Sequence, residues 1–289
     1  MKEYTIKANG KINLAIDVRK RLDNGYHEID MVTVPLELHD TINISYLKDN
    51  TAETYLFCND EKIPCDESNL VYKAYKLLKE KDDFSEKLKI FIYKRIPVEA
   101  GLGGGSSDAA AILMNLPAIL KKKNDIDIYS LAPMIGSDVS FFLNNRPARV
   151  LSTGDKLEDI TIKDSYYVLI VKPKVGLSTK LVYALYDEME EDIKRPNIQE
   201  LIEGLKTGDE EKIQVNMINV LTKPATNRVP IINDILYDMK MMNLPLSNMS
   251  GTGSACFALS KDKNYLKKVS EVFEKKGHKV FLTQFKLNS

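Results

Sequence analysis

The residues best suited to chemistry stand in one glycine-rich stretch, 97–111, which reads PVEAGLGGGSSDAAA. Glycine has no Cβ and tolerates positive φ, so a backbone rich in glycine can approach a bulky anion closely. Ser106, Ser107 and Asp108 are residue types that begin helices, and the alanines after them favour a helix. Such a helix N-terminus directs N–H groups and a positive dipole end at an anion. We therefore predict that residues 97–107, the glycine loop, bind phosphate.

Two familiar phosphate-binding motifs do not match the glycine loop. The P-loop motif is absent because no lysine follows the glycines. The dinucleotide-binding motif is absent because Ser106 stands where the third glycine is required. A plain turn before a surface helix is the simpler alternative. Four glycines in five positions, after the alternating strand pattern of residues 88–92, favour the phosphate-binding interpretation.

Three further polar residues could take part in phosphoryl chemistry. Lys11 and Asn13 are two positions apart, so in a strand their side chains share one face. A lysine there could neutralise a transferring phosphoryl group, although the sequence alone favours a solvated lysine on an edge strand. Asp138 lies among apolar residues after an expected helix at 126–135. A partly buried carboxylate needs partners, and capping a helix is the common alternative role.

Two turns carry candidate binding residues. Residues 21–26 contain Asn-Gly, a strong hairpin signal, and His27 follows directly. This histidine could be a general base or a ligand, although an exposed surface residue is the simplest interpretation. A second pair of glycines, Gly251 and Gly253, lies in a loop that could also be a plain connection between core elements.

The remaining pattern mixes strands and helices, which predicts an α+β fold in two domains. Alternating apolar residues indicate strands at 4–18, 29–36, 41–47 and 88–93. Apolar residues at helical spacing after Ser68 indicate an amphipathic helix that this serine caps. The sequence pattern changes near residues 153–155. We therefore expect an N-terminal domain at 1–155 and a C-terminal domain at 156–289.

Composition excludes several classes of protein. The 289 residues contain 41 basic and 41 acidic side chains, so the chain has no net positive charge that would attract a nucleic acid. No apolar run is long enough to span a bilayer, and the first residues lack the apolar core of a signal peptide. Three cysteines without C-x-x-C spacing are typical of reduced thiols, and H-E-x-x-H is absent. We expect a cytoplasmic protein without a membrane partner.

The glycine loop resembles the P-x-x-x-G-L-G-S-S motif of the GHMP kinases. Its longer form, G-L-G-G-G-S-S-D-A-A-A, is similar to the branch whose substrate carries a cytidine diphosphate moiety. The resemblance implies a two-domain GHMP kinase fold, with an N-terminal domain like domain 2 of ribosomal protein S5 and a C-terminal ferredoxin-like domain. It also implies an active site between the domains, and ATP-dependent phosphorylation of a hydroxyl group on a small molecule, by a monomer or a homodimer.

The resemblance also implies roles for individual residues. Asp138 is the implied catalytic base, and Lys11 steadies that carboxylate and the developing charge. Ser107 is the implied Mg²⁺ ligand. The residues implied to bind ATP are Asn69, Lys94, Pro97, Val98, Glu99, Ala100, Gly101, Leu102, Gly103, Gly104, Gly105, Ser106 and Ser107. The residues implied to bind the substrate are Asn13, Tyr26, His27, Thr179, Tyr183, Gly251 and Thr252.

The chain departs from the family pattern at Asn24, Pro117, Ser140, Lys180 and Ser254. Three alternatives therefore accompany the main interpretation. The first is another small-molecule kinase of the same superfamily, and the second is a catalytically silent nucleotide-binding paralogue. The third is an RNA-binding protein that reuses an S5-like fold, for which a basic face would be expected.

Overall fold

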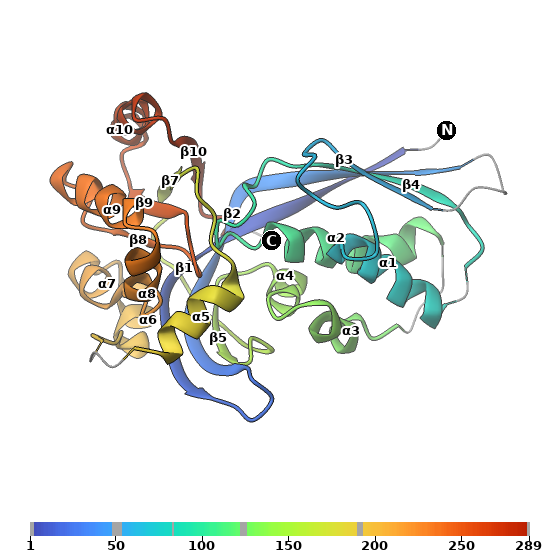
Figure 1. Ribbon diagram of the computed structural model, residues 1–289, viewed down its shortest axis with the longest axis horizontal. Helices are drawn as coiled ribbons and strands as arrows, with labels where there is room; N and C mark the ends of the chain where they lie inside the picture. The colour runs from blue at the N-terminus through green and yellow to red at the C-terminus, as the bar shows by residue number, and fades with distance from the viewer. Residues whose placement is uncertain (1–2, 48–53, 83, 122–125, 190–192, 288–289) are drawn as a thin grey trace. The chain divides into compact units, whose positions relative to one another are not determined.

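A computed structural model describes residues 3–47, 54–82, 84–121, 126–189 and 193–287 (Figure 1). The chain divides into two compact units, each made of separate segments. The first unit consists of Met1–Gly10, Leu38–Ile96 and Gly103–Asn145. The second unit consists of Lys11–Glu37, Pro97–Leu102 and Arg146–Ser289. The predicted mixture of helices and strands is confirmed. The domain limits at residues 155 and 156 stay a prediction, as do the names expected for the two subfolds.

The first unit places helices against one face of a sheet (Figure 1). Its strands are residues 3–10 of β1 (Glu3–Arg21) and residues 38–46 of β2 (His27–Tyr46), together with β3 (Tyr55–Cys58) and β4 (Leu88–Tyr93). Strand β4 pairs antiparallel with Thr41–Tyr46 of β2 and parallel with β3. The helices are α1 (Leu70–Lys81), α2 (Gly104–Ile119), α3 (Ile128–Ile135) and α4 (Val139–Asn144).

The amphipathic helix expected after residue 68 is α1. Its predicted apolar face is confirmed, because Val71, Ala74, Tyr75 and Leu78 are all buried. The predicted cap is wrong by one residue: the Asn69 side chain accepts the N–H of Val71.

The second unit contains the remaining strands. The Ile29–Thr33 part of β2 pairs antiparallel with β5 (Ala148–Ser152), and β5 pairs with β6 (Lys156–Asp159). A separate antiparallel sheet has the order β10-β7-β9-β8. Its strands are β7 (Tyr167–Lys172), β8 (Ser247–Met249), β9 (Cys256–Ser260) and β10 (Lys279–Gln284).

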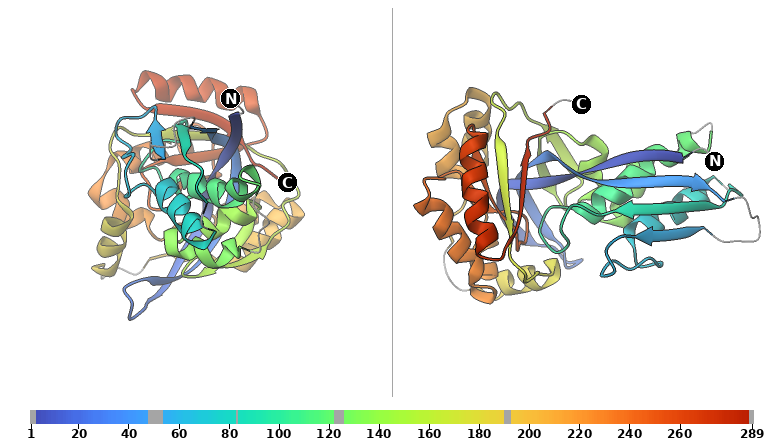
Figure 2. Two further views of the ribbon diagram at one scale, coloured as in Figure 1. Left: turned by 90° about the vertical axis from the view of Figure 1, so that its right-hand side faces the viewer. Right: turned by 90° about the horizontal axis from the view of Figure 1, so that it is seen from above.

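Helices cover this second sheet. Figure 2 shows α10 lying along β10 and β7. The helices of the unit are α5 (Thr179–Asp187), α6 (Ile198–Thr207), α7 (Glu210–Asn216), α8 (Thr222–Arg228), α9 (Ile231–Met241) and α10 (Lys263–Lys275). Among the described parts of the chain, no helix is both long and apolar enough to cross a membrane.

Candidate active site

The start of α2 is built to receive an anion. Its N-cap is Gly103, which adopts a left-handed conformation (φ 70°) that favours glycine. No side chain caps the helix, and its first turn contains no acidic residue. Four N–H groups at a helix start need partners, and the helix dipole favours a negative charge there. The structure therefore agrees with a helix N-terminus in the glycine loop, but the helix begins at Gly104, and Ser106, Ser107 and Asp108 lie inside it and do not cap it.

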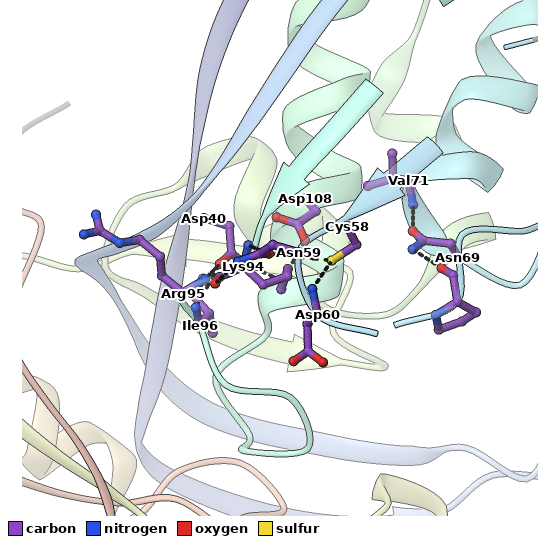
Figure 3. A network of polar contacts seen from close by, with 11 residues as sticks. Asp40, Cys58, Asn59, Asp60, Asn69, Val71, Lys94, Arg95, Ile96 and Asp108 are labelled. Atoms are coloured by element: carbon purple, nitrogen blue, oxygen red, sulfur yellow. Dashed lines mark hydrogen bonds and ion pairs between the residues drawn. The ribbon is translucent and has the colours of Figure 1, made fainter. Parts of the chain in front are cut away.

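A buried charge network holds the strand before the glycine loop against α2 (Figure 3). Asp40, which is fully buried in β2, accepts the backbone N–H groups of Arg95 and Ile96 at 2.5 and 2.8 Å. The Lys94 ammonium donates to Asp40 and, at 2.7 Å, to Oδ2 of Asp108 in α2. Three segments of the first unit are thereby joined through one ammonium group.

Asp108 is the less satisfied of the two carboxyl groups. Its Oδ1 is buried and has no hydrogen-bond partner within the described ranges. Burial, opposed by the Lys94 ammonium and reinforced by the Asp40 carboxylate, raises the pKa of Asp108 to about 7. A carboxyl group in this position is easier to bury in its neutral form.

We expect the variant Asp40→Ala to lower the free energy of unfolding by roughly 3 kcal/mol, because it breaks a buried ion pair. The two backbone N–H groups would also lose their acceptor. Urea unfolding would measure the change. The matched control is Glu67→Ala, which removes an exposed ion pair with Lys76 and should change stability by less than about 1 kcal/mol. An equal response of the two variants would contradict a stabilising role for Asp40.

Two side chains expected to bind ATP, those of Lys94 and Asn69, have structural partners. The Lys94 side chain is 6% exposed and is bound by two carboxylates. Asn69 caps α1 and donates to the carbonyl of Pro64 at 2.7 Å. Their contacts with a nucleotide stay predictions. Asn59, which the sequence did not single out, accepts the backbone N–H of Lys94 at 2.7 Å.

Asp138 lies next to α2 in the first unit. A Cβ placed on Gly136 would be 3.8 Å from Oγ of Ser106, so the 136–138 segment runs beside the first turn of α2. Asp138 precedes α4 but its side chain makes no capping hydrogen bond. The helix-capping alternative is therefore wrong, whereas the catalytic role of the Asp138 carboxylate stays a prediction.

In the second unit, Lys11 is part of the core of β1. Its side chain donates to Oδ1 of Asn13 at 2.5 Å, which confirms that the two residues share a face. Lys11 is 4% exposed, so the alternative of a solvated lysine is wrong. Its backbone N–H donates to the carbonyl of Leu102, at 3.0 Å, and so ties β1 to the glycine loop. The Asn13 amide in turn donates to Thr33 at 2.8 Å.

The glycine loop and the 249–254 loop touch through their backbones. A Cβ on Gly101 would be 2.0 Å from the carbonyl oxygen of Ser250, a distance that no side chain tolerates. The Ser250 hydroxyl donates to the carbonyl of Gly101 at 2.9 Å and accepts the N–H of Asn13 at 3.3 Å. Asn219 donates to the carbonyl of Gly251 at 2.8 Å. Ser250 and Asn219 were missed from the sequence, because ordinary polar residue types give no signal of these long-range contacts.

The turn between β1 and β2 lies beside α5 in the second unit (Figure 1). The ring of His27 stacks on Tyr183, with centroids 4.8 Å apart and planes at 26°. The side chain of His27 is only 7% exposed, so the exposed-residue interpretation is wrong. Thr179 contacts Thr252 through their hydroxyl groups at 3.3 Å. Tyr26, by contrast, is 60% exposed, and its role in binding a substrate stays a prediction.

His27 also meets Asp187, a residue that the sequence did not single out. Its Nε2 lies 2.6 Å from Oδ1 of the aspartate. Asp187 stands four positions after Tyr183 on α5, so both face the same side of the helix. The four-residue spacing between Tyr183 and Asp187 was the sequence signal that could have identified Asp187 as a neighbour of the predicted site.

Comparison with known sequences assigns the chain to a family. The model of the GHMP kinases N terminal domain matches residues 69–146. A 4-diphosphocytidyl-2-C-methyl-D-erythritol kinase from Clostridioides difficile is 37% identical over 260 residues, which cover 89% of this chain and 87% of that protein. The kinase of the same name from Alkaliphilus oremlandii is 38% identical over 267 residues, covering 90% and 89%. This chain belongs to the 4-diphosphocytidyl-2-C-methyl-D-erythritol kinase family.

Solved structures agree with this family and with its fold. A crystal structure of 4-(cytidine 5'-diphospho)-2C-methyl-D-erythritol kinase superimposes with a TM-score of 0.82 at 28% identity, covering 99% of this chain and 100% of the other. Homoserine kinase from Cytophaga hutchinsonii shares the fold, with a TM-score of 0.71 at 16% identity and coverage of 98% and 95%. As a member of a 4-diphosphocytidyl-2-C-methyl-D-erythritol kinase family, the chain uses ATP as its phosphoryl donor.

Proposed function

We propose that this chain transfers the γ-phosphoryl group of ATP to the 2-hydroxyl of 4-diphosphocytidyl-2-C-methyl-D-erythritol, in the synthesis of isoprenoid precursors by the non-mevalonate route. The observation that carries the proposal is the start of α2. There an uncapped helix N-terminus follows left-handed Gly103, and the segment with Asp138 runs beside it. A cytoplasmic location, a monomer or homodimer and the lack of a nucleic-acid partner stay predictions.

The chemistry requires little more than positioning and charge stabilisation. The N–H groups at the start of α2 hold the β- and γ-phosphates. Asp138 accepts the proton of the substrate hydroxyl as the hydroxyl oxygen bonds to the γ-phosphorus. The bond from that phosphorus to the β–γ bridging oxygen breaks, and ADP leaves. The Lys11 ammonium steadies the negative charge during the transfer.

Mg²⁺ fits this donor set as an ion carried by the nucleotide. Mg²⁺ typically takes one or two protein oxygens and completes its shell with phosphates and water. The buried hydroxyl of Ser107, in the first turn of α2, is such an oxygen donor. Within the described ranges no three His, Cys, Asp or Glu side chains gather into a cage for a metal. The ion, when bound, would neutralise phosphate charge.

We propose that His27 and Tyr183 receive the cytosine ring. A pyrimidine offers a π-face to an aromatic ring and a polar edge to the imidazole. The contact between Thr179 and Thr252 joins α5 to the 249–254 loop in the same unit. Mevalonate, homoserine and galactose have no such face.

We expect His27→Ala to weaken use of the cytidine substrate by roughly 1–3 kcal/mol in kcat/KM, the range for a lost buried polar contact. The KM for ATP should stay unchanged. Steady-state kinetics with each substrate varied in turn would separate the two effects.

The substrate itself is tested with the wild-type protein and Mg-ATP. The diphosphocytidyl substrate should be phosphorylated far faster than mevalonate, homoserine or galactose. Preference for one of those three would contradict the proposed substrate. ATP binding without turnover of any of them would instead support the catalytically silent paralogue.

A further inference from the structure

The contact between His27 and Asp187 fixes more than the position of the imidazole ring. A carboxylate oxygen accepts hydrogen bonds and does not donate them. The 2.6 Å contact between Nε2 and Oδ1 therefore requires a proton on Nε2. In a neutral imidazole the other nitrogen, Nδ1, then carries a lone pair and acts as an acceptor. No described residue bonds to Nδ1, so this acceptor is available to a ligand.

Asp187 is itself held in place. It is the last residue of α5, and its Oδ2 lies 3.5 Å from a guanidinium nitrogen of Arg21. Arg21 ends β1 and His27 begins β2, so one carboxylate contacts both ends of the turn. Stacking on Tyr183 fixes the plane of the imidazole. The direction of the Nδ1 lone pair is thus set by two residues of one helix.

We propose that Asp187 is a positioning residue which, by fixing the tautomer of His27, makes the pocket select cytosine over uracil. This inference rests on the proposed function. Cytosine carries an amino group at C4, which donates, whereas uracil carries a carbonyl oxygen there, which accepts. The amino group satisfies the lone pair of Nδ1, and the carbonyl oxygen would face it without a proton between them. Sites built around a hydrogen bond reject analogues that cannot make it.

The variant Asp187→Asn tests the inference because its amide can donate. An amide N–H at this position can bond to an unprotonated Nε2 and so favours the tautomer with the proton on Nδ1. The same change from aspartate to asparagine produces the wrong histidine tautomer in serine proteases. We expect the ratio of kcat/KM for the cytidine substrate over its uridine analogue to fall about tenfold or more, mainly through KM. The KM for ATP should not change. Asp187→Glu keeps the acceptor and should restore the preference for cytosine.

Nitrogen NMR of ¹⁵N-histidine-labelled protein gives an independent readout. The chain has only three histidines, and the His27 signals are assigned by their loss in His27→Ala. At a pH where histidine side chains are neutral, wild-type His27 should be protonated on Nε2 alone, and Asp187→Asn should move that proton to Nδ1. A wild-type proton on Nδ1 would overturn the proposal even if the variant did not fold. So would an unchanged cytosine-to-uracil ratio in a folded Asp187→Asn variant. If wild type phosphorylated neither nucleotide substrate, the proposed function would fail together with the specificity claim, while the NMR would still decide the tautomer.

Discussion

Replacing Asp138 with asparagine should lower kcat by about 10²–10⁴-fold, the loss expected when a general base is removed. Asparagine has nearly the same shape but cannot take the proton of the substrate hydroxyl. ATP affinity should hardly change, because the phosphates bind to backbone N–H groups of α2. The fold should also persist, since Asp138 makes no capping hydrogen bond to α4. Single-turnover kinetics and calorimetry with ATP would measure the two quantities.

The matched control is Asp127→Asn, one helix earlier. Asp127 caps α3 through a side-chain oxygen that asparagine also supplies, so activity should stay at the wild-type level. If Asp138→Asn kept a kcat close to that of the wild type, another group would have to accept the proton.

We also predict that Lys11 acts together with Asp138. Lys11→Met combined with Asp138→Asn should then cost much less than the product of the two single effects. Independent effects that multiply fully would contradict this coupling.

The variant Gly101→Ala should lower kcat/KM for ATP by about 10²-fold or more. The added Cβ would lie 2.0 Å from the backbone oxygen of Ser250, so one of the two loops must move. A displacement of about 1 Å near bound substrate can cost that much in rate. The left-handed conformation at Gly101 (φ 72°) adds strain of about 1–2 kcal/mol for any L-residue. Kinetics with ATP varied, together with urea unfolding, would separate the loop displacement from the strain.

Gly277→Ala is the matched control for backbone strain. Gly277 has a similar φ of 82°, but a Cβ there would meet no atom within 4 Å. This variant should lose a similar 1–2 kcal/mol of stability to the left-handed conformation and keep full activity. If both variants lost stability equally and Gly101→Ala remained fully active, then contact between the loops would not position the glycine loop.

Features encoded by nearby residues were predictable from the sequence. The buried face of α1 follows from apolar residues spaced three and four apart, and the start of α2 follows from the glycines and alanines around residue 104. The error at the cap of α1 is local too. The Ser68 hydroxyl donates to Asp66, which leaves Asn69 to accept the helix N–H. Two adjacent capping residues compete here, and sequence does not rank them.

Contacts that join distant parts of the chain were not predictable. Asp40 lies 54 positions from Lys94, and Asp187 lies 160 positions from His27. Charged residues are common on protein surfaces, so nothing in the type of Asp40 marks it as fully buried. The family resemblance indicated Lys11 and Asp138 but not the side chains that support the predicted site residues. Those supporting side chains required the structure.

The interleaved segments of the two units have a consequence for protein synthesis. Every segment of the first unit has been translated once residue 145 is made, whereas Lys11–Glu37 belongs with a partner segment that begins at Arg146. N-terminal regions generally fold first during translation. The middle of β1 and β2, including the fully buried Ile12 and Leu14, is therefore made before β5, which pairs with Ile29–Thr33, and before Phe285, which bridges to Leu36. A strand edge without its partner is prone to aggregate, so we expect a nascent chain between residues 146 and 285 to depend more on chaperones than the finished protein does.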